Sequence, residues 1–241
     1  MSKDDTKLDP VSLEVLASGA EKTFENAERL CSEAELLAKA GAISRAVYLH
    51  QISLEECSKV DTLGAWAVSL LVGLEADQKN VIAALARHSS KNKSNAYMLE
   101  PSEAEEGAKS RGDVKRAIEA FKAFQEEFHK TSNQAKNAAL YVDWVHGAFA
   151  APSERISEQT LVEITERNAK FLGYAHNGVM MLKRLAASPD KMKDLLAGFV
   201  EQAEKLRDET AENPVVAMEA LLARILSEGK RELKDEIVSY S

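Results

Sequence analysis

Apolar residues recur along most of the 241-residue chain at the three- and four-residue spacing of an amphipathic helix. The predicted helices span residues 10–39, 42–72, about 76–99, 114–150 and 157–187, with two further helices starting at 188 and 214. Only Ala40 and Gly41 separate the first two helices. Because this connection is so short, we expect these two helices to pack as an antiparallel hairpin.

The second predicted helix carries two adjacent carboxylates in different positions. Its apolar arc is formed by Ala42, Leu49, Ile52, Ser53, Val60, Leu63, Ala67, Leu70 and Leu71, and Glu56 falls near the middle of this arc. A buried carboxylate needs a partner or must become neutral. Glu55 lies to one side of the arc, where it could pair with Lys59 one turn later. The pattern therefore predicts that Glu56 is the buried acid.

The composition favours an all-α fold. Gly and Pro are few, at 11 and 5 residues, and runs of alternating β-branched residues are absent. We expect a flexible tail at residues 1–9, a bundle of long antiparallel helices at 10–150, and a C-terminal helical extension at 151–241 that packs on the bundle. Residues 102–113 are predicted to form a charged connection.

The net charge of −8 argues against extensive coating of nucleic acid and against binding to anionic membranes. A local basic site remains compatible with this charge. No apolar run of about 18 residues occurs, and the polar N-terminus has no signal core. The two cysteines, Cys31 and Cys57, have no metal-binding spacing and are expected to be reduced core thiols. We therefore expect a cytoplasmic protein without a membrane partner.

The densest basic cluster in a predicted helix is formed by Arg87, His88, Lys91 and Lys93, interleaved with Ser and Asn. Such a cluster could line a polar pocket for a phosphodiester or an acidic partner, with His88 as general acid or base. Alternatively, His88 and Lys91 neutralise the two glutamates across the helix pair and form a structural network. The spacing alone leaves both interpretations open.

Other candidate groups give weaker patterns. Arg45 and His50 have an Arg-x4-His spacing, but they point to different sides of the helix. Glu126 and His129 form a single Glu-x-x-His, whereas a di-iron bundle uses this motif twice. Asp143 is predicted to lie late in the fourth long helix, near its packed face. No phosphate-binding glycine loop and no zinc spacing is present, so we expect no metal and no cofactor.

Three segments together resemble the AbiV family of abortive infection proteins, within the HEPN class of helical bacterial defence and toxin proteins. They are AGAISRAVYLHQISLEECSKV, ARHSSKNK and NAALYVDW, and the resemblance covers about residues 20–175. It implies a HEPN-like bundle, a role in antiphage defence and a tendency to form homodimers. Many HEPN proteins cleave RNA with an Arg-x4–6-His motif late in the bundle. In this chain the Arg45–His50 pair lies early instead.

The resemblance implies an effector that binds a phage-derived or host component and blocks phage propagation, at the level of gene expression. The expected polar pocket consists of Glu55, Glu56, Lys59, Arg87, His88, Lys91 and Asp143. The first alternative is a metal-independent ribonuclease in which His88 and Lys91 are catalytic and RNA is the partner. The second alternative is a non-enzymatic helical scaffold. In the first hypothesis a phage protein is the activator or the target.

Overall fold

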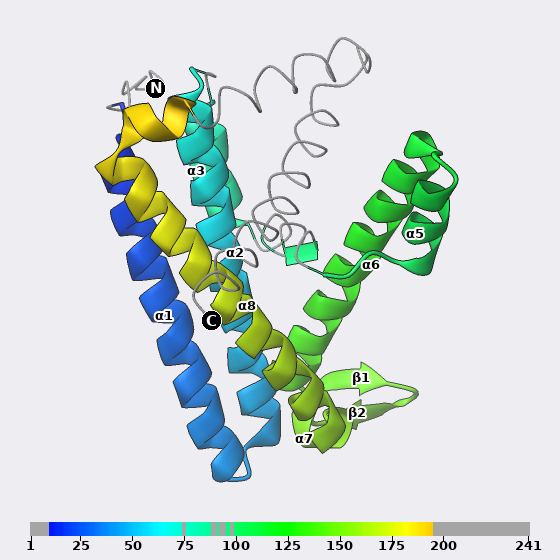
Figure 1. Ribbon diagram of the computed structural model, residues 1–241. Coiled ribbons are helices and arrows are strands. Elements are labelled where there is room, and N and C mark those ends of the chain that lie inside the picture. Colours follow the sequence, from blue (N-terminus) through cyan, green and yellow to red (C-terminus); the bar gives the residue numbers. More distant parts are fainter. Residues whose placement is uncertain (1–9, 74–75, 88–90, 92–94, 97–98, 195–241) are drawn as a thin grey trace, which may run out of the picture. The chain divides into compact units, whose positions relative to one another are not determined.

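The computed structural model describes residues 10–73, 76–87, 91, 95–96 and 99–194 (Figure 1). The elements are α1 (Leu13–Lys39), α2 (Ile43–Leu71), α3 (Gln78–Ala86), α5 (Glu103–Ser110), α6 (Val114–Leu140), β1 (Asp143–Val145), β2 (Ala148–Ala150), α7 (Pro152–Arg155) and α8 (Glu158–Ala187). Lys91, Asn95 and Ala96 are also helical. The prediction of an all-α bundle of long helices is confirmed, with one small β-hairpin as an exception.

Helix α2 is central to the bundle. It packs against α1 and α8, which also contact each other, and against α6 (Figure 1). Fully buried alanines at positions 20, 27 and 34 of α1 allow a close approach of the helix backbones. The remaining core is aliphatic and aromatic, and includes Leu54, Val60, Trp66, Phe171, Val179 and Leu182. Because helices surround α2, apolar and polar residues on several of its sides are buried.

Local signals explain where the helices begin. Ser12, Asp77, Ser102 and Asp113 each accept a hydrogen bond from a backbone N–H in the first turn of the helix that follows. Gly41 adopts a left-handed conformation (φ +79°) between α1 and α2. The two helices pack closely on each other, in agreement with the predicted helical hairpin.

The fourth long helix is shorter than predicted. It ends at Leu140, and residues 143–150 form an antiparallel hairpin with the register Asp143↔Ala150, Trp144↔Phe149 and Val145↔Ala148. His146 and Gly147 turn the chain, both with positive φ. The prediction that Asp143 lies on a helix was therefore wrong. Valine and aromatic residues around a His-Gly turn favour strands over a helix.

Two other predicted segments also differ from the structure. The helix expected to run from about 76 to 99 ends at Ala86, because Arg87 is extended. The charged connection at 102–113 contains the helix α5, whose first turn carries Glu103, Glu105 and Glu106. Acidic residues stabilise the positive end of the helix dipole, and this explains why so polar a segment is helical.

The chain divides into two compact units, Met1–Ala187 and Ser188–Ser241. This division falls later than the boundary expected at 150, because α8 packs on α1 and α2 as part of the first unit. In the second unit the structure describes a helical start at residues 189–194. The predicted tail at 1–9 and the helix expected from 214 lie outside the described residues. None of the helices in the described ranges is long and apolar enough to cross a membrane.

Candidate functional site

Glu55 is the buried acid of α2, with its side chain about 1% exposed. Its two carboxylate oxygens bind two lysines: Lys136 Nζ of α6 lies 2.9 Å from Oε1, and Lys91 Nζ lies 3.2 Å from Oε2. Both lysines are buried as well. A buried charge costs several kcal/mol unless it is paired, so these contacts stabilise one another. The cluster therefore joins α2, α6 and the helical residue 91.

Asn95, like Lys91, contacts α2. Its Nδ2 donates to the carbonyl oxygen of Leu54 at 2.9 Å, and its side chain is fully buried. Ser58 donates to the carbonyl oxygen of Glu55 at 2.8 Å. Residues 91 and 95 are thus anchored to the same turn of α2 by one ion pair and one hydrogen bond.

Glu56 lies in a more open position than Glu55. It forms an ion pair with Lys59 and accepts a hydrogen bond from Asn26 Nδ2 of α1 at 3.1 Å. The predicted roles of the two glutamates were therefore wrong: Glu55 is buried, and Glu56 pairs with Lys59. The prediction assumed one buried face, whereas α2 is covered on several sides.

The other residues of the expected pocket do not join this cluster in the described part of the chain. Arg87 is exposed at the end of α3. Asp143 Oδ2 accepts a hydrogen bond at 2.5 Å from Arg155 Nη1 of α7. His88 lies outside the described residues. The structure thus brings together Glu55 and Lys91 and adds Lys136, which the sequence analysis missed.

His50 belongs to a separate polar network between α2 and α8. Its ring is about 1% exposed, with Nδ1 at 3.0 Å from Asn168 Nδ2 and Nε2 at 3.2 Å from Thr165 Oγ1. Because the amide Nδ2 is a donor, Nδ1 accepts and the ring N–H points to Thr165. Ser53 Oγ lies 3.1 Å from Asn168 Oδ1 and 2.7 Å from the Ala27 carbonyl oxygen.

The environment of His50 disfavours its charged form. Burial lowers the pKa of the His50 imidazole, and the negative charge of Glu35 opposes this effect. Both ring nitrogens are already engaged by α8 side chains. His50 is therefore a neutral structural group in this conformation, without access to a substrate.

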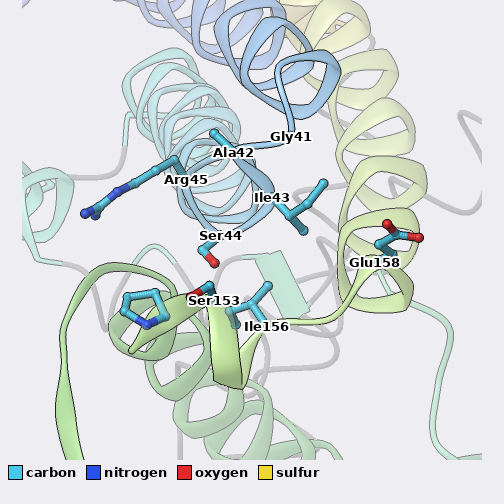
Figure 2. A pocket seen from close by; sticks show the side chains of 9 residues that line it. Gly41, Ala42, Ile43, Ser44, Arg45, Ser153, Ile156 and Glu158 are labelled. Atoms are coloured by element: carbon cyan, nitrogen blue, oxygen red, sulfur yellow. The ribbon is translucent and has the colours of Figure 1, made fainter. Parts of the chain in front are cut away.

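Arg45 lies apart from His50. It is exposed, and its Nη1 donates to the carbonyl oxygen of Leu140 at the end of α6 at 3.2 Å. Arg45 also borders an open hollow of about 530 Å³ between the start of α2 and the α7 region. Figure 2 shows Ser44 and Ser153 facing each other in this hollow, with Arg45 extending away from them. The Arg-x4-His pair therefore does not form one site.

Burial affects three further titratable groups. It raises the pKa of the Asp61 carboxyl to about 7, and it raises the pKa values of the Cys31 and Cys57 thiols. Thiols with raised pKa values are poor nucleophiles at neutral pH. Within the described ranges, no three His, Cys, Asp or Glu side chains are grouped closely enough to hold a metal ion.

The sequence model of the HEPN_AbiV family, described as AbiV, matches residues 15–173. The chain belongs to the AbiV family. An uncharacterized protein, y4gJ of Sinorhizobium fredii (strain NBRC 101917 / NGR234), is 59% identical over 108 residues, which cover 45% of this chain and 56% of the relative. The chain thus spans little more than half of the length of that relative. No solved structure matches the chain.

The AbiV match covers the main features described above. It begins at residue 15 in α1, ends about half-way along α8, and includes the Glu55 cluster, the His50 network and the hairpin. It ends before Ala187, where the first compact unit ends. The matched residues therefore lie within the first compact unit.

One functional candidate could have been found from the pattern. Lys136 lies four residues after Ser132 and three before Ala139, so the helical period places all three on one face, and both neighbours are buried. A lysine inside an apolar stripe needs a carboxylate partner. Asn95 and Asn168, in contrast, could not have been predicted to be buried, because asparagine is mostly a surface residue and an uncharged amide needs no ionic partner.

Proposed function

We propose that this AbiV-family chain is an abortive-infection defence protein that binds a phage or host component upon infection and blocks phage propagation. The observation that carries this proposal is the family match over residues 15–173. The block acts at the level of gene expression or translation. A cytoplasmic location, a homodimer and a phage protein as activator or target are parts of the same proposal.

The contacts of His50 and Lys91 support binding rather than catalysis by these two groups. His50 is buried and hydrogen-bonded to Thr165 and Asn168, which prevents it from reaching an RNA backbone. Lys91 is buried against Glu55. A general acid or base must lie within hydrogen-bond reach of its substrate, and neither group meets this requirement in the described conformation.

We assign the binding role to the segment around Arg87, His88 and Lys91. The Glu55–Lys91 ion pair and the Asn95–Leu54 hydrogen bond attach Lys91 and Asn95 to α2. Exposed Arg87 at its start can then meet a partner with acidic groups. In this proposal Glu55 and Lys136 are anchors that position the segment.

The first test is a plaque assay in a bacterial host that carries the gene or an empty vector. We expect fewer plaques, or a smaller burst, with the wild-type gene. Arg87→Ala should lose protection without a change in melting temperature, whereas the matched exposed variant Arg29→Ala in α1 should keep it. Equal protection by both variants would contradict a binding role of the segment around Arg87.

Unchanged plaque numbers over a broad phage panel, including rhizobial phages, would contradict the defence proposal.

The second test separates binding from cleavage. Purified protein is incubated with total RNA or transfer RNA, and the products are resolved by electrophoresis. We expect intact RNA at high protein concentration. Cleavage by the wild type that is lost in folded His88→Ala would establish the ribonuclease alternative and overturn the binding mechanism.

A further inference from the structure

The hairpin of β1 and β2 carries a concentration of exposed apolar side chains. Trp144 is 62% exposed, Phe149 73%, and the preceding Tyr141 and Val142 are more than half exposed. Figure 1 shows the hairpin extending beside α7 at one end of α6. Single exposed apolar residues are common on proteins, but four within ten residues form a patch, which marks an interaction surface.

Two of these side chains form one aromatic platform. Trp144 and Phe149 are directly opposite in the register of the hairpin, so they lie on the same face of the sheet. Their rings meet edge to face, with centroids 5.0 Å apart and planes at 78°. The pair holds both rings in place before any partner binds.

The hairpin surface is nearly free of net charge. Asp143 is the only Asp, Glu, Lys or Arg in residues 141–150, and it is already paired with Arg155. The chain as a whole carries a net charge of −8. Because both copies carry this negative charge, they repel each other. Contact through an uncharged apolar patch brings the fewest like charges together and so has the lowest electrostatic cost.

The backbone of the hairpin also suits self-association. Among the described residues β1 and β2 pair only with each other, which leaves one open edge on each strand. An antiparallel edge can pair with its own copy across a two-fold axis, and two-fold contacts are the commonest in homo-oligomers. A nucleic-acid partner is disfavoured, because the patch has no unpaired basic residue to neutralise phosphates.

We infer that the aromatic hairpin of residues 141–150 is the surface through which two copies of this chain associate. The inference deepens the homodimer part of the proposed function, and it does not depend on defence activity. Tyr141, Val142, Trp144 and Phe149 offer on the order of 450 Å² per copy, given the usual size of these side chains. A standard interface uses roughly 800 Å² per partner. The contact should therefore be weak and dependent on concentration.

The test is sedimentation velocity of the purified full chain from about 1 to about 200 μM, a range suited to a small interface. We expect a monomer–dimer equilibrium in the wild type and a monomer in the Trp144→Thr/Phe149→Thr variant. Threonine keeps the strand preference, and circular dichroism checks that the helices are unchanged. Leu36→Gln, which removes an exposed apolar residue of α1, is the matched control and should dimerise as the wild type does.

Tryptophan fluorescence gives an independent measurement. The chain has two tryptophans, and Trp66 is buried while Trp144 is exposed. In the wild type, quenching by acrylamide should fall as the protein concentration rises, because the partner copy covers Trp144.

A monomer at all concentrations would overturn the inference, and so would a dimer that persists in the double variant. A hairpin that is covered only after a phage protein is added would assign the surface to that protein instead. The sedimentation and quenching measurements on the chain alone need no phage, so a negative plaque assay would leave their result intact.

Discussion

Two neighbouring glutamates of α2 differ sharply in their surroundings. Glu55 is buried between Lys91 and Lys136, whereas Glu56 meets Lys59 and Asn26 near the surface. Glu55→Gln would remove the carboxylate that two buried ammonium groups share, and breaking such a network costs about 3 kcal/mol or more of unfolding free energy. Glu56→Gln should cost less than about 1 kcal/mol. Urea unfolding of both variants checks this, and equal losses would contradict the placement of Glu55.

His50 gives a prediction for the dependence of stability on pH. Burial lowers the pKa of His50 in the folded protein below the ordinary value of 6.5. As the pH falls below about 6.5, the unfolded chain binds a proton at this histidine before the folded protein does, so the contribution of His50 to stability decreases. We therefore expect the wild type to be more stable than His50→Gln at pH 8 and the difference to narrow towards pH 5.

The comparison with His50→Gln is needed because Asp61 acts in the opposite direction. Its raised pKa of about 7 means that the folded protein keeps a proton that the unfolded chain loses, so this group favours the folded state at low pH. Asp61 is present in both proteins and cancels in the difference. A difference that is constant or widens on acidification would show that His50 is not buried as a neutral group.

At the scale of single residues, the sequence located the polar pairs only in part. It singled out Glu56 as an acid within an apolar arc, Glu55 as the neighbouring acid, and Lys91 as a member of a basic cluster. It did not assign the correct buried glutamate, since a single apolar arc predicts only one covered face of α2. Which sides of a helix are covered depends on the number of its neighbours, and this is a property of the packed fold.

At the scale of elements, two glycines of α8 offer a matched pair. A Cβ on Gly178 would lie 3.0 Å from Val60 Cγ1 of α2, whereas a Cβ on Gly173 would meet nothing within 4 Å. Val60 is buried and β-branched, so it cannot easily move. Gly178→Ala should therefore cost about 1–2 kcal/mol, and Gly173→Ala should gain about 0.5–1 kcal/mol from helix propensity.

Thermal unfolding followed by circular dichroism measures both glycine variants. The control is Gly178→Ala combined with Val60→Ala, which should destabilise less than the sum of the two single changes because the clash is relieved. Additive effects would indicate that α2 and α8 are not in contact at this position.

The elements could be predicted to different degrees. The long helices follow from their apolar period and from caps such as Ser12 and Asp113. The hairpin was missed because Tyr141–Trp144 directly continues the helical pattern of α6. The local evidence for strands was nevertheless present in Val142, Trp144 and Val145 before His146-Gly147 and in Phe149 after it. A short hairpin has too few residues to alter the composition of the chain.

For the whole molecule, the unit 1–187 should fold independently of the rest of the chain. A truncated protein that ends at Asp190 retains α8, and we expect it to unfold cooperatively. A protein that ends at Ile156 lacks α8 and exposes the apolar surfaces of α1 and α2 that this helix covers. It should be aggregated or molten. Cooperative unfolding of the shorter protein would contradict the assignment of α8 to the bundle core.

The class of the fold and the family could be recognised from the sequence, because both depend on features distributed over the chain. Sparse glycine and proline, the helical period and the order of three short segments were sufficient. The end of the bundle could not be recognised, because the helix at 158–187 has the same amphipathic pattern whether it packs in the core or on its surface. Whether this helix belongs to the core depends on its packing against α1 and α2, and these helices are distant in the sequence.

The enclosed position of α2 has a consequence for local opening of the backbone. Its amides can exchange with deuterium only when neighbouring helices separate, because α1, α6 and α8 all pack on it. The amides of α2 around Ser53 and Leu54 should therefore exchange last, with an opening free energy close to that of global unfolding. The amides of the exposed hairpin should exchange within the first time points. The slowest hydrogen exchange is therefore expected in α2, and the fastest in the hairpin that carries the exposed aromatic residues.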